Sequence, residues 1–191
     1  MPKSFSEQER AVIRQNLINA CRECWNRYGY QKTNIRELAE TANISTGAFY
    51  QFYESKELIF ADAAQSYETA LVQILDSYMA KHPGKQGLAG GIKALTAEMK
   101  TMRWIKAFLD DWPVILRKLP EDFMHDDFLR DLGHYEKLVK KYNLVPKKKM
   151  KEITQVINFL LIAFVRHQSV PGDTGAVFGI IVDAVINSLF E

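Results

Sequence analysis

Apolar residues recur every three or four positions along most of this chain, a spacing that places them on one face of a helix. The first such stripe covers residues 5–28 and ends before Gly29, a residue type that commonly closes helices. Further stripes predict helices over 55–81, 121–141, 146–168 and 174–190. Helical spacing also resumes near residue 92 and is present over 102–118. No alternating strand pattern of useful length is present, so the sequence predicts an all-α fold.

Glycine and proline mark the expected breaks between these helices. The segment 82–91, HPGKQGLAGG, holds four glycines and one proline and predicts a loop. Pro113 is expected to start or kink a helix, because proline lacks the N–H of a helix interior. Pro146 is expected to open one long helix, and Pro171 with Gly172 to precede the last one.

The stretch 29–57 contains two very short helices joined by a tight turn. Asn34 can cap the first helix, and Glu37 can reach back to complete a capping box. The helix ends at Asn43, a residue that tolerates a left-handed turn. Ser45 can cap the second helix, over the next six residues, which opens with small side chains. Such a pair is typical of a helix-turn-helix, whose second helix enters the major groove of DNA.

The same stretch resembles the DNA-binding domain of the TetR (tetracycline-repressor) family of bacterial transcriptional regulators, over roughly residues 10–60. The matching residues are Gly29-Tyr30, Thr33, Leu38-Ala39, Ala42, Ile44-Ser45, Gly47, Tyr50 and Ser55-Lys56-Glu57. The departures from the family pattern are Asn34, Asn43, Ala48 and Tyr53. Ala48 stands where the family carries a threonine, so one hydroxyl that could touch DNA is missing.

The resemblance implies a DNA-binding domain over residues 1–54 with contacts of two kinds. The expected contacts are to base edges from Thr46, Ala48 and Gln51, to phosphates from Thr33, Tyr50 and Lys56, and to either from Arg36, with Asn34, Ser45 and Gly47 completing the surface. The expected partner is a double-stranded, palindromic operator read by two copies of the chain.

The resemblance also implies a ligand-binding and dimerisation domain over residues 55–191. Two broad apolar stripes are expected to form a four-helix bundle with a second copy. They comprise Ile153, Val156, Ile157, Leu160, Leu161, Phe164, Val177, Phe178, Ile181, Val185 and Leu189. The alternative is that these residues are only the core of their own domain.

Aromatic residues concentrate between positions 99 and 128 and are candidates to line an apolar ligand cavity. The predicted ligand-binding residues are Trp104, Phe108, Trp112 and Phe128, with plain core packing as the alternative. Cys21 and Cys24 have the spacing of a metal or redox pair. Core packing is the favoured interpretation, because the sequence holds no second cysteine pair and both residues lie in the apolar stripe of their helix. The sequence predicts no catalytic residue, no metal and no cofactor.

Composition and charge predict a soluble, cytoplasmic globular protein. The chain has 191 residues, of which 47% are hydrophobic and 25% charged, without a signal-peptide core or a membrane-spanning run. The net charge is +2, and residues 1–60 hold eight Lys and Arg against seven acids. DNA binding must therefore depend on where individual charges lie, because a strongly basic surface is absent.

Taken together, the sequence predicts a dimeric transcriptional regulator, a repressor that dissociates from its operator when a small apolar or amphipathic ligand binds. Two other classes stay open. One is a DNA-binding adaptor or activator that a protein partner switches without any small ligand. The other is a helical enzyme or carrier whose DNA-binding head has decayed.

Overall fold

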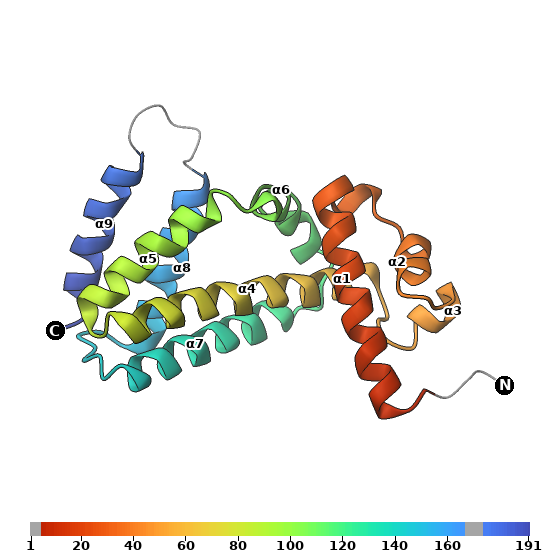
Figure 1. Ribbon diagram of the computed structural model, residues 1–191, viewed down its shortest axis with the longest axis horizontal. Helices are drawn as coiled ribbons and strands as arrows, with labels where there is room; N and C mark the ends of the chain where they lie inside the picture. The colour runs from red at the N-terminus through yellow and green to blue at the C-terminus, as the bar shows by residue number, and fades with distance from the viewer. Residues whose placement is uncertain (1–4, 167–173) are drawn as a thin grey trace. The chain divides into compact units, whose positions relative to one another are not determined.

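A computed structural model describes residues 5–166 and 174–191, which form helices joined by short connections (Figure 1). The helices are α1 Glu7–Lys32, α2 Ile35–Thr41, α3 Thr46–Phe49, α4 Lys56–Lys81, α5 Lys85–Met99, α6 Arg103–Leu116, α7 Phe123–Lys141, α8 Met150–Arg166 and α9 Thr174–Leu189. The all-α prediction is confirmed, with one isolated β-bridge between Pro146 and Phe190. Over the described residues, no helix is both long and apolar enough to cross a membrane.

The chain divides into two compact units. The first unit contains the residues up to Tyr67 together with 106–120, and the second contains 68–105 and 121–191. The helices α4 and α6 each supply residues to both units. The predicted division between residues 54 and 55 did not anticipate that 106–120 pack with the N-terminal helices.

Trp25 is the centre of the first unit's core. It is 1% exposed, and its ring centroid lies 4.8 Å from that of Phe60 and 5.9 Å from that of Phe108. Cys21 and Cys24 are buried beside it on α1, which confirms the packing prediction for both thiols. Burial also raises the pKa of the Cys24 thiol to about 11, so this sulfur is a weak nucleophile at neutral pH.

In the second unit, α5, α8 and α9 pack against one another (Figure 1). Phe164 of α8 and Phe178 of α9 meet with ring centroids 4.3 Å apart. Lys93 of α5 binds both carboxylate oxygens of Asp183 on α9, at 2.6 and 2.7 Å. The apolar contacts supply most of the stabilisation, because an exposed ion pair contributes little.

The predicted loop over 82–91 is wrong, because α5 begins at Lys85 and includes three of the four glycines. These glycines allow a close approach between α5 and α4. A Cβ at Gly91 would lie 2.6 Å from Leu75 Cδ1, and one at Gly90 would lie 2.7 Å from the Tyr78 hydroxyl oxygen. Close packing therefore stabilises a helix that glycine alone disfavours.

Proline also breaks the helices less than predicted. Pro113 lies inside α6, which continues to Leu116, and α8 begins at Met150 rather than at Pro146. Pro146 instead bridges to Phe190 at the end of α9. The predicted end of α8 near residue 168 and the break at 171–172 lie outside the described residues.

We predict that Gly87→Ala destabilises the second unit by about 3 kcal/mol, at the upper end of the usual cost of overpacking. A Cβ at this position would lie 1.4 Å from the His82 carbonyl oxygen, a backbone atom that cannot turn aside. Gly133→Ala is the matched control, because its Cβ meets nothing within 4 Å and alanine favours helices. Urea unfolding followed by circular dichroism compares the two, and equal stability would contradict the packing argument.

Candidate functional site

Two short helices joined by a turn follow α1, and local hydrogen bonds set their boundaries. Asn34 caps α2, because its Oδ1 accepts from the Glu37 N–H at 2.8 Å. The turn passes through Asn43 at φ 58°, in the left-handed region that asparagine tolerates. Ser45 caps α3, and its Oγ accepts from the Ala48 N–H at 3.1 Å. The two predicted caps and the left-handed turn are therefore confirmed, whereas the cap of α2 consists of the Asn34 contact without the predicted return contact from the Glu37 side chain.

The inner side of this helix-turn-helix is anchored by apolar contacts. Phe49 of α3 is completely buried, and its ring centroid lies 5.8 Å from that of Tyr53. Leu38 and Ala39 of α2 are also completely buried. Since α3 is only four residues long, these contacts hold it in place rather than its own hydrogen bonds.

The outer side presents a candidate reading surface. Its exposed members are Asn34, Arg36, Ser45, Thr46, Gly47, Tyr50 and Gln51. Ala48 and Lys56 are half-buried at its edge. Thr33 lies outside this surface, because it is 2% exposed and its hydroxyl donates to the Gly29 carbonyl at 2.9 Å.

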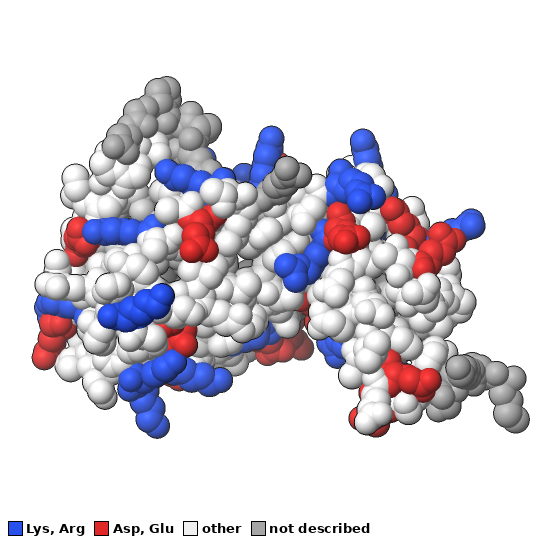
Figure 2. Space-filling view, viewed as in Figure 1, with Lys and Arg blue, Asp and Glu red and all other residues white. Residues whose placement is uncertain are grey.

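The two predicted cationic contacts are both engaged within the first unit. Arg36 Nε binds Glu40 Oε1 at 2.8 Å. The Lys56 ammonium lies 4.3 Å from the ring centroid of Tyr30, and burial lowers the pKa of this lysine. Figure 2 shows acidic and basic side chains interspersed over the face that it presents.

Arg10 supports the reading surface from α1, a role that the sequence did not reveal. Its guanidinium donates to the Gln51 carbonyl at 3.0 Å and lies 4.8 Å from the ring centroid of Phe52. Both contacts hold the turn that follows α3. The pairing spans 41 positions in sequence, so no local pattern predicts it.

Asp111 of α6 joins α6 to the start of the helix-turn-helix. Its Oδ2 accepts from Trp25 Nε1 at 2.9 Å and from the Tyr30 N–H at 2.8 Å. Gly29 between them adopts φ 78°, and a Cβ there would lie 3.3 Å from the same carboxylate oxygen. Lys118 adds a second link by donating to the Tyr30 hydroxyl at 2.9 Å. These links hold residues 106–120 in the first unit.

The structure separates the four predicted ligand-binding residues. Phe108 and Trp112 belong to the first unit, where their ring centroids lie 5.9 and 6.5 Å from that of Trp25. Trp104 and Phe128 belong to the second unit. Core packing, the alternative given above, describes the first pair.

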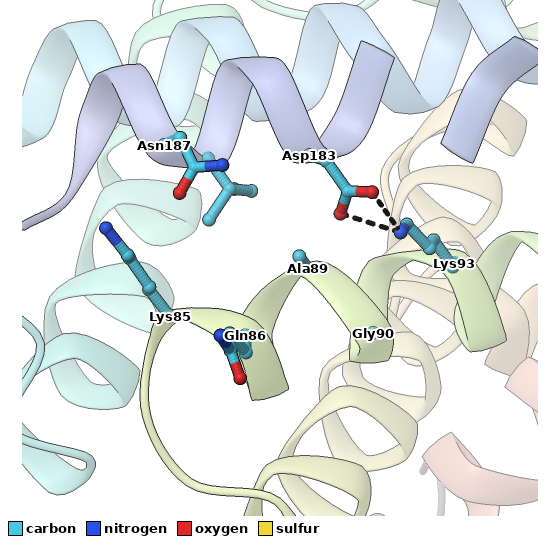
Figure 3. A pocket seen from close by; sticks show the side chains of 8 residues that line it. Lys85, Gln86, Ala89, Gly90, Lys93, Asp183 and Asn187 are labelled. Atoms are coloured by element: carbon cyan, nitrogen blue, oxygen red, sulfur yellow. Dashed lines mark hydrogen bonds and ion pairs between the residues drawn. The ribbon is translucent and has the colours of Figure 1, made fainter. Parts of the chain in front are cut away.

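A hollow of about 140 Å³ lies between α5 and α9 of the second unit (Figure 3). Lys85 and Asn187 line one part of it, and the ion pair between Lys93 and Asp183 borders another. None of the four predicted ligand-binding residues lines this hollow, and polar groups make up much of its wall.

The predicted dimer residues divide by burial into three groups. Six of them are buried within one chain: Ile153, Ile157, Leu160, Phe164, Phe178 and Leu189. Two others are exposed, Val177 at 59% and Ile181 at 42%, and three large apolar residues that were not predicted are exposed on the same helices: Phe159 at 73%, Ile162 at 55% and Ile180 at 71%. We call these five residues the α8–α9 apolar face. Val156, Leu161 and Val185 are half-buried.

Comparison with known proteins gives the family of the helix-turn-helix. Residues 17–63 match the model of a family described as bacterial regulatory proteins, tetR family. Over 64% of its length, the chain is 30% identical to the HTH-type transcriptional repressor Rv1474c of Mycobacterium tuberculosis. It spans 58% of that repressor, which is less than two thirds of its length.

Two further relatives extend the likeness. The HTH-type transcriptional repressor AcnR of Corynebacterium diphtheriae is 28% identical over 149 residues, which cover 68% of this chain and 77% of that repressor. The crystal structure of RolR in complex with resorcinol has a TM-score of 0.65 at 20% identity, covering 96% of this chain and 90% of that one. The second likeness extends over nearly the whole chain and shows a common fold.

We predict that Asp111→Ala destabilises the first unit by about 2 kcal/mol, because it leaves the Trp25 indole and Tyr30 amide donors unpaired. Asp110→Ala is the control, since it removes an exposed acid one position earlier. Urea unfolding followed by tryptophan fluorescence measures the difference. Equal destabilisation by both changes would show that the Asp111 hydrogen bonds contribute nothing specific.

Proposed function

This chain belongs to the tetR family of bacterial regulatory proteins, and we propose that it represses transcription by binding a palindromic operator until a small molecule releases it. The observation that carries the proposal is the reading surface. The anchored α3 and the turn after it present Thr46, Gly47 and Gln51 to solvent, and the first residues of α3 carry small side chains. Such a helix end fits closely into a major groove.

In the proposed complex, Thr46, Ala48 and Gln51 face base edges. The methyl group of Ala48 suits contact with a thymine methyl, and the amide of Gln51 suits a bidentate contact with adenine. Tyr50, 54% exposed with its ring edge against Phe49, is positioned to donate to a phosphate. These contacts place sequence readout in α3 and affinity in the residues around it.

A second copy is needed to read a palindrome, and the α8–α9 apolar face supports one. Five large apolar side chains exposed on two adjacent helices are more than a monomer usually leaves in water. We propose that this face meets its symmetry mate in a four-helix bundle. The two reading surfaces then contact half-sites about one helical turn of DNA apart, or a multiple of it.

The proposed release couples ligand binding to the reading surface through α6. Residues of α6 belong to both units, and its Asp111 binds the backbone next to Gly29. A ligand that favours a different position of α6 would lower the population of the conformation that binds the operator. A coupling of about 1–3 kcal/mol is typical of such regulators. The RolR complex with resorcinol supports a small aromatic molecule as effector class.

A regulator switched by a protein partner is the second candidate. It is favoured by Phe108 and Trp112, two predicted ligand-binding residues that pack on Trp25 in the core of the first unit. A thermal-shift screen against apolar and amphipathic molecules separates the two candidates, because only the first predicts stabilisation by mass action.

We predict that Gly47→Leu abolishes operator binding, with a loss of at least about 100-fold, because the side chain would hold α3 away from the groove. The position tolerates a Cβ, since its nearest contact would be Ser45 Oγ at 3.9 Å. Gly133→Leu makes the same change in the second unit, in open space, and should bind normally. Fluorescence anisotropy with selected operator DNA measures both, and normal binding by the Gly47 variant would remove α3 from the interface.

We predict that Phe159→Glu combined with Ile180→Glu gives folded monomers, because both side chains are exposed and neither supports the core of its own chain. Light scattering measures the mass and circular dichroism the helicity. Leu160→Asp is the contrasting variant and should unfold the second unit, since Leu160 is 8% exposed. A dimer that survives the double substitution would place the interface elsewhere.

A further inference from the structure

A group of charged and polar side chains lies inside the second unit, on one face of α7. Asp127, Arg130, Asp131 and His134 follow one another at three- and four-residue spacing, so they share that face. Glu68 of α4 interacts electrostatically with the two aspartates and the arginine. We call these five residues the α7 cluster. The DNA-binding function makes no use of these groups.

The α7 cluster carries an excess of negative charge. It has three carboxylates against one guanidinium, and Arg130 is already paired with Asp127. Asp131 accepts a hydrogen bond from Asn158 Nδ2 of α8 at 2.5 Å. No described residue donates a hydrogen bond to Glu68. Glu68 and Asp131 therefore share the remaining positive charge of Arg130 and His134, and neither carboxylate forms an ion pair of its own with a described residue.

Three polar atoms in and beside the cluster are buried without a hydrogen-bond partner: Arg130 Nε, His134 Nδ1 and Thr154 Oγ1. Thr154 is completely buried, and it lies four residues before Asn158 on the same face of α8. A buried polar atom without a partner costs about 1–3 kcal/mol, and most native proteins avoid it. A bound molecule with its own polar groups would satisfy these atoms.

We propose that the α7 cluster is the binding site of a small organic cation, a protonated amine or amidine. Its charge pairs with Glu68 and Asp131, and its polar groups bond to Thr154 and His134. The effect of this cation on the operator rests on the proposed function, whereas its binding does not.

The charges around Glu68 make this binding depend on pH. Burial and the charges of Asp127 and Asp131 raise the pKa of Glu68 to about 8, while Arg130 opposes the rise. Tyr135 faces the same region from α7, and the nearby α8 groups Thr154 and Asn158 are uncharged. A cation favours ionised Glu68, so below about pH 8 binding releases the carboxyl proton of Glu68 to the solvent.

Benzamidine and putrescine are suitable probes, with benzamide as the neutral counterpart of benzamidine. Calorimetry on the whole protein should show that a cationic probe binds and that benzamide does not. Affinity should rise about tenfold from pH 6.5 to pH 8.5, since Glu68 is mostly protonated at the lower pH. In two buffers of different ionisation enthalpy, the apparent binding enthalpies should differ at pH 7, because a proton is released.

Two conservative variants assign the site. Glu68→Gln should weaken binding of the probe by about tenfold at pH 8.5 and remove its pH dependence. Asp131→Asn should weaken it similarly while keeping an oxygen that accepts from Asn158. Glu136→Gln changes an exposed acid of the same helix and should leave binding unchanged. Circular dichroism checks that each variant remains helical.

The proposal is overturned if neither cationic probe binds at millimolar concentration, if benzamide binds as tightly as benzamidine, or if Glu68→Gln binds as well as the unaltered protein. Operator titration is a separate measurement. A cation that binds at Glu68 without changing operator affinity would keep this site and remove ligand release from the proposed function. If an apolar molecule releases the operator and binds equally well to Glu68→Gln, the proposed function is kept. In that case the α7 cluster is not the site through which the ligand acts.

Discussion

The hydrogen bonds of one carboxylate, Asp111, shape the part of the molecule on which DNA binding depends. The regular geometry of α1 is interrupted at Gly29, and the chain after it leads directly into α2 and α3. The break leaves the Tyr30 amide without a regular helical partner, and Asp111 accepts from it. Because the same oxygen also accepts from Trp25, the direction of the chain into the helix-turn-helix is tied to the core of the first unit.

This arrangement explains how a helix as short as α3 keeps its position. Four residues cannot maintain a helix in water, so α3 needs the buried Phe49 and the caps at Ser45 and Asn34. Each of these depends on α2, which begins three positions after α1 ends. A small change at Gly29 would therefore displace the whole reading surface. Rigidity of this kind suits readout by a few side chains, because a misplaced donor loses its base.

Local chemistry predicted this part of the fold well, because its determinants lie within a few residues of one another. The caps Asn34 and Ser45 and the turn at Asn43 are each a residue type that meets a backbone requirement nearby. The glycines of α5 mislead for the opposite reason. The local sequence favours a loop at these glycines. In the structure they lie in α5, where Gly90 and Gly91 leave space for the side chains of Tyr78 and Leu75.

Hydrophobic spacing has a related limit at α8 and α9. It identifies which residues avoid water but not which surface covers them. Leu160 is covered by its own chain, whereas the neighbouring Phe159 remains exposed. Only the packing of α5 and α8 against α9 shows which apolar side chains are buried within the chain and which remain exposed. The Asp111 contacts, which span 81 and 86 positions, are equally invisible to a local pattern.

The distribution of polar groups shows how the two units differ in their chemistry. In the first unit, buried donors such as the Trp25 indole and the Thr33 hydroxyl have partners, which suits a head that must keep one shape. In the second unit, Thr154 and His134 have buried atoms without hydrogen-bond partners, in a region where three carboxylates share one guanidinium. That arrangement lowers stability, since folding removes these groups from water and returns no hydrogen bond. The lost stability is recovered when a ligand satisfies the same groups, so a unit built this way gains more from binding than a fully satisfied one.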